Sequence, residues 1–200
     1  MTRQRGRILI FAGPTGAGKG TVEKAIMERF DAIQFSVSVT TRPRRNYEVE
    51  GKHYFFIDEA TFRAKIANDE LIEWEQVFTN GYLYGTLRSY VDEAMEEGKL
   101  LLLDIDIKGG LNVQRQYPQE SISIFIQPPS VEELERRLIA RGTDSPEQIR
   151  IRMDRMPEEM ELSREFDYRI INDNLDKAVE EVSQILVEQV FKNEGVHTWD

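Results

Sequence analysis

The sequence contains no cysteine, which excludes a disulfide framework and any metal site built on thiolates. Its only two histidines, His53 and His197, lack the spacing of metal ligands. No apolar run approaches the roughly 18 residues that a membrane-spanning helix needs, and the basic segment 1–7 lacks the apolar stretch of a secretory signal. We therefore expect a soluble, cytoplasmic protein without a membrane partner.

Positive charge is scarce, because 26 lysines and arginines face 36 aspartates and glutamates, which gives a net charge of −10. A nucleic-acid-binding domain normally presents a basic face, so this balance disfavours a nucleic-acid partner. The arginines nevertheless gather in local groups that suit a smaller anion. These groups are Arg42, Arg44 and Arg45; Arg136, Arg137 and Arg141; and Arg150, Arg152 and Arg155. For the last two groups, a solvated helix face is an equally good interpretation.

Glycine is concentrated between an apolar run at 8–12, which predicts a buried strand, and a segment of helical periodicity at 22–30. A strand, a glycine-rich turn and a helix form the context of a phosphate-binding P-loop. In such a loop the backbone N–H groups, the helix N-terminus and Lys19 hold a phosphate chain. A turn without any ligand is the weaker interpretation. The P-loop residues are Gly13, Pro14, Thr15, Gly16, Ala17, Gly18, Lys19, Gly20 and Thr21.

The P-loop departs from the strict motif at Gly20, where serine or threonine is usual, and the hydroxyl comes one place later at Thr21. Because of this shift, the sequence leaves open which hydroxyl faces a magnesium ion.

The rest of the chain alternates between strand-like and helix-like segments, except in its middle. Core strands are predicted at 8–12, 100–104, 121–126 and 168–171. Helices are predicted at 22–30, 89–97, from after Gly110 to about 117, at 130–141 with Ser130 as its cap, from 146 onward and at 175–191. The middle, about 35–90, predicts short strands at 34–41, 53–57, 71–78 and 82–85, a hairpin turn at Asn80-Gly81 and a helix at 59–68 capped by Asp58.

This order predicts an α/β fold of the P-loop NTPase type, with a three-layer α/β/α core, a parallel sheet and an inserted mixed or antiparallel subdomain. A ligand is expected at the carboxyl ends of the parallel strands. Asp104 ends one of these strands, which is where P-loop NTPases place a carboxylate that helps to hold Mg²⁺.

Several short segments resemble, in order and spacing, the signatures of the guanylate kinase family over roughly residues 7–190. They are FSVSVTTR at 35–42, EVEGKHY at 48–54, IEW at 72–74, YGT at 84–86, LDID at 103–106 and IND at 171–173. The resemblance implies Mg²⁺-dependent transfer of the γ-phosphoryl group of ATP to GMP, and to dGMP, in purine nucleotide metabolism. It also divides the chain into a P-loop core (1–34, 92–129 and 156–200), a GMP-binding subdomain (35–91) and a helical lid (130–155).

For the acceptor, the resemblance implies that Glu73 accepts from N1 and N2 of guanine, while the hydroxyls of Ser38 and Thr86 face O6 and N7. Its remaining GMP ligands are Arg42, Arg45, Tyr54 and Tyr84, which hold the phosphate, and Asp106, which contacts GMP or metal-bound water. Arg44 stays an alternative to Arg45, and the division of roles among Glu48, Asp104 and Asp106 stays open.

For the donor, the resemblance implies that the lid arginines Arg137, Arg141 and Arg152 act with Lys19 on the transferred group, and that Asn172 contacts the base of ATP. Thr21, and Asp104 through water, are the expected Mg²⁺ ligands. No side chain is expected to act as an essential general base.

Two other functions compete with this interpretation. A non-catalytic guanylate-kinase-like interaction module would typically lack the P-loop residues Gly13, Gly18 and Lys19, which are present here. Another P-loop small-molecule kinase would not need the guanine-edge residues Ser38 and Glu73. No obligate protein partner is expected.

Overall fold

The computed structural model of the protein describes residues 5–77 and 81–191. These residues form two compact units, and each is described by itself. The first unit comprises the described residues up to Ile10 and those of the segment 33–121, and the second comprises 11–32 and the described residues from Ile122 onward. No helix in either unit, as far as the chain is described, is long and apolar enough to cross a membrane.

The first unit contains strands of the parallel sheet, in the order β2-β7-β1. β2 (Ile33–Phe35) pairs in parallel with β7 (Leu100–Asp104), and the part of β1 (Arg7–Ala12) up to Ile10 neighbours β7. All of β7 except Asp104 is buried, as expected for a strand of a parallel sheet. The strands predicted at 8–12 and 100–104 are confirmed.

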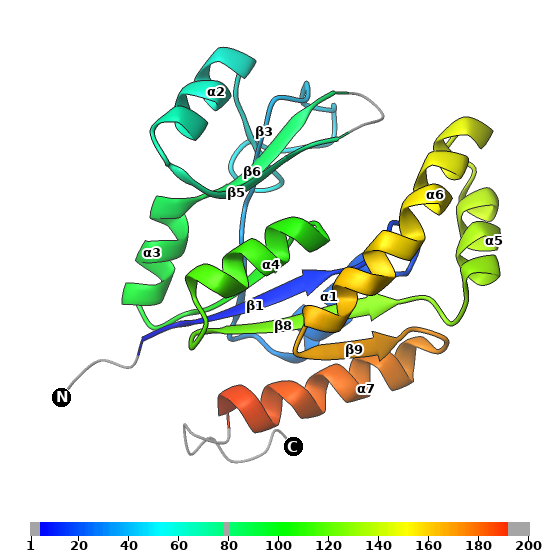
Figure 1. The fold of residues 1–200 in the computed structure, drawn as a ribbon. Helices are drawn as coiled ribbons and strands as arrows, with labels where there is room; N and C mark the ends of the chain where they lie inside the picture. The colour runs from blue at the N-terminus through cyan, green and yellow to red at the C-terminus, as the bar shows by residue number, and fades with distance from the viewer. Residues whose placement is uncertain (1–4, 78–80, 192–200) are drawn as a thin grey trace. The chain divides into compact units, whose positions relative to one another are not determined.

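The second sheet of this unit is mixed, which confirms the expected mixed or antiparallel subdomain. Its order is β4-β3-β6-β5, with β3 and β4 parallel and the other pairs antiparallel. Helix α2 (Glu59–Ala67) lies against it, because Phe62 packs with Val39 and Leu83 (Figure 1). The strands are β3 (Val39–Thr40), β4 (Phe55–Phe56), β5 (Leu71–Gln76) and β6 (Leu83–Leu87).

Helices α2 and α4 (Ile107–Gln116) of the first unit begin at side-chain caps, and the sequence predicted the first of these. Asp58 caps α2 by accepting from the backbone N–H of Thr61, as predicted. α4 begins earlier than predicted, because Asp106 accepts from the backbone N–H of Gly109 at 2.9 Å and so forms the cap. Between them in the chain lies α3 (Arg88–Glu96), which begins without a side-chain cap.

Two strand predictions in the first unit were wrong in extent. The segment predicted as one strand at 34–41 is divided between β2 and β3, which belong to different sheets. The division follows from the pairing partners, because Phe35 lies opposite Leu102 whereas Val39 lies opposite Gly85. The strand predicted at 53–57 is reduced to β4. The predicted turn at Asn80-Gly81 lies partly outside the described residues.

The second unit contains parallel strands and several helices. The order is β1-β8-β9, and β8 (Ser121–Gln127) pairs in parallel with β9 (Tyr168–Ile171). α1 (Lys19–Arg29) packs on α7 (Leu175–Leu186), where Arg29 donates to Glu180 at 2.8 Å. The predicted helix at 175–191 is α7 followed by a π-helical turn, η2 (Val187–Phe191).

A helical hairpin belongs to the same unit and consists of α5 (Val131–Arg141) and α6 (Pro146–Leu162), followed by the short η1 (Ser163–Glu165). Ser130 caps α5 as predicted, and Ser145 forms a capping box with Gln148 at the start of α6. The two helices are joined by an apolar core of Leu134, Leu138, Ile149 and Met156.

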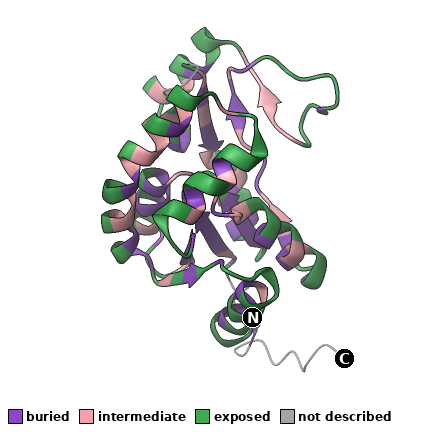
Figure 2. Ribbon diagram, turned by 90° about the vertical axis from the view of Figure 1, so that its right-hand side faces the viewer, coloured by how far each residue is buried: buried purple, intermediate pink, exposed green. Residues whose placement is uncertain are grey.

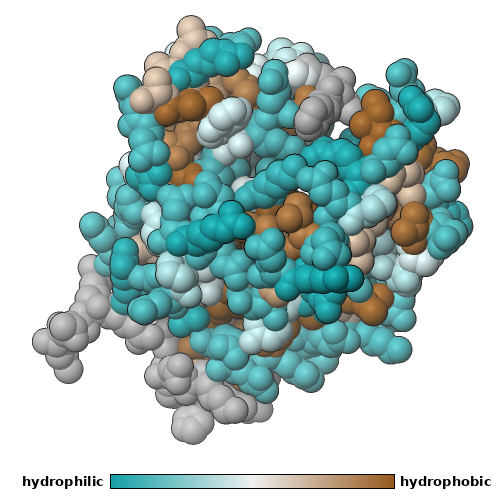
Figure 3. Space-filling view, viewed as in Figure 1, coloured by the Kyte–Doolittle hydropathy of each residue, from teal (hydrophilic) through white to brown (hydrophobic). Residues whose placement is uncertain are grey.

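Burial follows the expected pattern within each unit, with buried strands and helices that are exposed on their outer faces (Figure 2). One face of the surface is mostly hydrophilic, with apolar side chains in separate areas, as expected for a chain with 31% charged residues (Figure 3). The observed elements and the parallel core sheet confirm the predicted α/β class.

Candidate active site

The glycine-rich loop connects β1 to α1 in the second unit, and its glycines are required by its geometry. Gly13, Gly16 and Gly18 have φ angles of 152°, 99° and 89°, which side chains rarely allow. A Cβ atom at Gly13 would lie 2.2 Å from the carbonyl oxygen of Ile126, and one at Gly18 would lie 2.3 Å from Nδ2 of Asn172. The loop therefore has the tight backbone that the P-loop interpretation predicts.

Asn172 and Arg137 both contact this loop. Nδ2 of Asn172 donates to the carbonyl of Ala17 at 2.9 Å, and the Asn172 backbone N–H donates to Gln127 at 2.8 Å. Arg137 donates through Nη1 to the Ala17 carbonyl at 3.4 Å and through Nη2 to the Asn172 carbonyl at 3.0 Å. The end of β9 and helix α5 thus bring two predicted donor-site residues together with the P-loop.

Lys19 begins helix α1, and its Nζ lies 3.7 Å from Oε1 of Glu23 one turn later. Glu23 is buried, and burial raises its pKa, although the charge of Lys19 acts in the opposite direction. The sequence analysis missed Glu23, which the i, i+4 spacing on the helix could have indicated.

Steric crowding does not explain why Gly20 replaces the serine or threonine that is usual at this position of a P-loop. A Cβ atom there would meet nothing closer than Oε2 of Glu23 at 3.9 Å, and Gly20 is not among the glycines with positive φ. Thr21 is exposed in the first turn of α1. A hydroxyl at either position is therefore sterically possible.

The arginines of the helical hairpin are held by carboxylates. Arg141 donates to Oδ2 of Asp144 at 2.6 Å, and Arg152 donates to Oδ1 of the same residue at 3.4 Å. Burial alone would raise the pKa of Asp144, but the hydrogen bond from Arg141 and the charge of Arg152 outweigh it, and the pKa is lowered. The sequence analysis missed Asp144, because no local pattern distinguishes it from a solvated loop residue.

Arg137 is paired separately with Glu133, to which it donates at 2.8 Å. Glu133 also accepts from Arg136, and hydrogen bonds from Arg136 and then Arg137 lower the pKa of Glu133 to about 2. This carboxylate remains charged at neutral pH.

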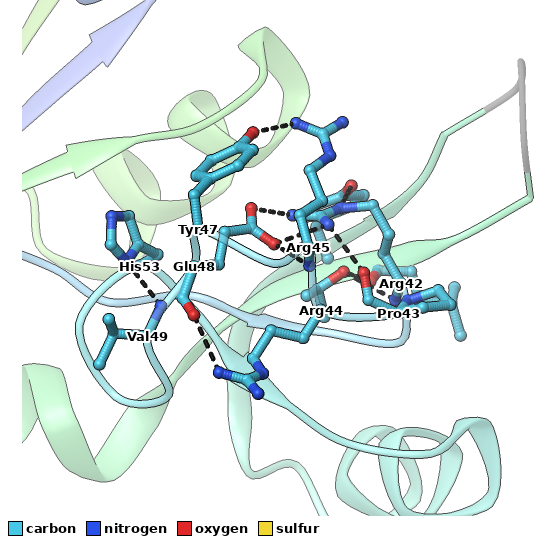
Figure 4. A network of polar contacts seen from close by, with 11 residues as sticks. Arg42, Pro43, Arg44, Arg45, Tyr47, Glu48, Val49 and His53 are labelled. Atoms are coloured by element: carbon cyan, nitrogen blue, oxygen red, sulfur yellow. Dashed lines mark hydrogen bonds and ion pairs between the residues drawn. The ribbon is translucent and has the colours of Figure 1, made fainter.

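In the first unit, Arg42 and Glu48 form a buried pair with two parallel hydrogen bonds of 2.9 and 2.6 Å (Figure 4). Nε of Arg42 donates to the hydroxyl of Tyr84 at 3.2 Å, and its guanidinium lies 5.3 Å from the ring centroid of Tyr54. The hydrogen bond with Glu48 raises the pKa of Arg42, and the same bond lowers the pKa of Glu48 to about 2. Three of the predicted phosphate ligands are therefore neighbours.

Glu48 also organises the two neighbouring arginines. Its carboxylate accepts from the backbone N–H of Arg45 at 2.7 Å, and its carbonyl accepts from the side chain of Arg44 at 3.0 Å. The exposed side chain of Arg45 donates to the hydroxyl of Tyr47 at 2.8 Å (Figure 4). The orienting role that was left open for Glu48 thus has a direct structural basis.

Glu73 is buried on β5, and its Oε1 accepts from the hydroxyl of Thr86 on β6 at 2.6 Å. The two residues are brought together because they lie opposite each other in the antiparallel pair. A Cβ atom at Gly109 would lie 2.9 Å from Oε2 of Glu73 and 3.3 Å from Oδ2 of Asp106, so the glycine leaves space for both carboxylates. Burial raises the pKa of Glu73 to about 7 and outweighs the hydrogen bond from Thr86, while the charge of Asp106 adds to the increase.

Ser38 and His53 belong to the same unit. Ser38 is half-buried, and its carbonyl accepts from the backbone N–H of Phe55 at 2.9 Å. His53 accepts from the backbone N–H of Val49 at 2.9 Å through Nδ1. Its backbone N–H also donates to the carbonyl of Val49 at 3.1 Å, so both hydrogen bonds described for His53 lie within the loop.

The expected magnesium ligands have suitable chemistry. Asp104 is exposed at the end of β7, and Thr21 is exposed at the start of α1. Within the part of the chain that is described, no group of three or more histidines, cysteines or carboxylates could hold a metal ion. Hydroxyl and carboxylate oxygens suit Mg²⁺, which usually takes one or two protein ligands together with substrate phosphates. The residues present thus fit a metal held largely by a nucleotide.

Comparisons with known proteins agree with these features. The family model described as guanylate kinase matches residues 5–189. The chain is 40% identical to the guanylate kinase of Syntrophomonas wolfei, covering 94% of this chain and 95% of that protein. It is 41% identical to the guanylate kinase of Thermotoga maritima, covering 91% of this chain and 86% of that protein. The crystal structure of guanylate kinase from Anaplasma phagocytophilum matches with a TM-score of 0.73 at 34% identity, covering 94% and 88% of the two chains.

Proposed function

The chain belongs to the guanylate kinase family, and from this premise we propose which of its residues carry the transfer of the γ-phosphoryl group of ATP to GMP. The reaction gives ADP and GDP. The observation that carries the assignment is the buried Glu73, whose carboxylate accepts from Thr86 beside Asp106. A buried carboxylate in this setting matches a base that presents two adjacent N–H donors.

Guanine is recognised through its hydrogen-bonding edge. Glu73 accepts from N1–H and from the exocyclic N2 group, while Thr86 and Ser38 face O6 and N7. Adenine presents no such pair of donors, so it would leave buried polar groups unpaired, which produces large discrimination. The support from this chain is the burial of Glu73 and its contact with Thr86.

The GMP phosphate is bound by Arg42, Arg45, Tyr54 and Tyr84. A guanidinium group binds phosphate oxygens well when its orientation is fixed. Glu48 supplies that orientation for Arg42 and fixes the backbone at Arg45. Asp106 contacts GMP from the start of α4.

The phosphates of ATP are bound by the backbone N–H groups of the P-loop and by Lys19. The lid arginines Arg137, Arg141 and Arg152 neutralise the charge that develops on the transferred group, and they exclude water. Asn172 shapes the loop through its bond to Ala17 and contacts the ATP base. We keep residues 35–91 as the GMP-binding subdomain, 130–155 as the lid, and the remaining segments as the core.

Magnesium, when bound, would neutralise phosphate charge, and Thr21 would hold it together with Asp104 through water. The positioning and electrostatics supplied by the chain's own residues leave no essential step for a side-chain general base.

A coupled assay of ADP release tests the proposal. Wild-type protein should turn over with GMP and much less with AMP. Lys19→Ala should reduce turnover by more than about a hundredfold while the circular dichroism spectrum is retained. Lys24→Ala removes the same charge from an exposed position on the same helix and should leave turnover unchanged.

Two results would contradict the proposal. A folded wild-type protein that binds GMP without turnover would favour an interaction module. Equal turnover with AMP and GMP would favour another small-molecule kinase.

A further inference from the structure

The connection between α5 and α6 contains a carboxylate that serves two of the lid arginines. Asp144 follows the end of α5, and each of its oxygens accepts from a different arginine, Arg141 at 2.6 Å and Arg152 at 3.4 Å. The side chain of Asp144 is 9% exposed, whereas those of Arg141 and Arg152 are 44% and 28% exposed. The carboxylate of Asp144 is therefore more buried than the two arginine side chains that donate to it.

The hairpin has other means of stability. Its helices share the apolar core formed around Leu138 and Met156. Gly142 ends α5 with a φ angle of 67°, and Ser145 forms the capping box of α6. The side chain of Asp144 takes part in none of these features, so its described polar contacts are directed at the two arginines.

Holding the arginines together requires a counter-charge. Two guanidinium groups drawn toward one phosphoryl group repel each other, and both side chains lose rotamer freedom when they are fixed. Asp144 offsets the repulsion and fixes both side chains before a substrate arrives. Nε of Arg152 is buried without a hydrogen-bond partner within the described structure, so Arg152 keeps a donor that Asp144 does not use.

We propose that Asp144 is a positioning residue for phosphoryl transfer, which holds Arg141 and Arg152 in the orientation in which they meet the charge of the transferred group. The inference rests on the proposed function, because it requires that these arginines act on that group. Asp144 itself touches no reacting atom. Its removal is therefore expected to change the chemical step more than substrate binding.

The first test is Asp144→Asn, which keeps the size of the side chain and removes its charge. The turnover number kcat should fall about tenfold to a hundredfold, as expected when catalytic groups are misplaced, while KM for ATP and GMP changes less than threefold. Asp144→Glu should recover part of the loss, because it restores the charge. Asp154→Asn removes the same charge from an exposed position on α6 and should retain full kcat. The melting temperatures of all variants are measured beside the kinetics.

The second test is a double-mutant cycle. Asp144→Asn should lower kcat much less in the Arg141→Ala, Arg152→Ala background than in the wild type, because its effect passes through these arginines. The same fall in both backgrounds would overturn the inference.

Further outcomes distinguish the inference from the proposed function. If Asp144→Asn keeps full kcat while the arginine variants lose activity, Asp144 has no positioning role, but the lid assignment stands. If the arginine variants keep full kcat, both the lid assignment and this inference are wrong. A third outcome is that kcat of Asp144→Asn falls only in proportion to a lowered melting temperature, and that Asp144→Glu restores neither kcat nor the melting temperature. The role of Asp144 is then structural, and the inference is overturned.

Discussion

Replacing Glu73 with glutamine is expected to separate activity from stability. The substitution keeps the shape of the side chain and an acceptor for the hydroxyl of Thr86, but it removes the negative charge. Because this charge is buried, its removal should stabilise the free protein at alkaline pH. Because the same charge is proposed to recognise guanine, its removal should impair the use of GMP.

The stability effect follows from the pKa of Glu73. Burial raises this pKa from its ordinary value of 4.5 to about 7, so the folded protein binds more protons than the unfolded chain between these values. The group's contribution is therefore fully present below pH 4.5 and is lost as the pH rises through about 7. At about 1.4 kcal/mol for each pH unit between the two pKa values, the loss comes to about 3 kcal/mol at pH 8.

The activity effect follows from the number of acceptors. The glutamine side chain offers one acceptor oxygen, whereas the carboxylate offers two to the adjacent N–H donors of guanine. Losing hydrogen bonds to a charged group costs about 1.5–3 kcal/mol each. One such bond is lost, so we expect kcat/KM for GMP to fall by about tenfold to 150-fold, while KM for ATP changes less than about twofold.

The experiment combines GMP titrations at several pH values with urea unfolding at pH 8. In the wild type, kcat/KM for GMP should rise with pH through about 7, because the ionised form of Glu73 binds guanine. The Glu73→Gln variant should lack this dependence and should be about 2–3 kcal/mol more stable at pH 8. Glu75→Gln removes a charge from the same strand and should leave GMP specificity intact.

Two results would refute this reasoning. An equal loss in the use of ATP and GMP would remove Glu73 from guanine recognition. A Glu73→Gln variant that is less stable than wild type at pH 8 would show that the carboxylate is not destabilised by burial.

Three further substitutions test the geometry of the two units. Gly18→Ala should reduce kcat/KM for ATP by at least about tenfold, because its Cβ would displace Asn172 and the backbone would be strained; kinetics and a melting curve check this. Arg42→Lys should raise KM for GMP about tenfold or more, because lysine cannot form the paired bonds to Glu48, and GMP titration measures it. Gly20→Ser should fold normally and stabilise α1 by a few tenths of a kcal/mol, which thermal unfolding detects, since its Cβ would make only an ordinary van der Waals contact with Glu23.

The sequence by itself determined the features that depend on neighbouring residues. The P-loop was predictable because its glycines lie between a buried strand and a helix, and the structure places Gly13 and Gly18 in conformations that favour glycine. The caps at Asp58 and Ser130 were predictable because a cap contacts a backbone N–H only three residues away. The family resemblance added the acceptor residues, which no local pattern would have selected.

The tertiary structure decided the features that depend on distant partners. The segment 34–41 could not be divided from its own sequence, because its two ends pair with strands of different sheets, β7 and β6, which are both distant from it in the chain. The contact between Glu73 and Thr86 depends on the register of two strands. The raised pKa of Glu73 depends on its burial.

The same limit applies to Asp144, whose two arginines come from different helices, Arg141 from the end of α5 and Arg152 from the interior of α6. Local conformational preferences act over a few residues, so the sequence displays them directly. Burial, and ion pairs between separate segments, arise only when the folded chain has brought those segments together, and they fix which charged groups of distant segments bind one another.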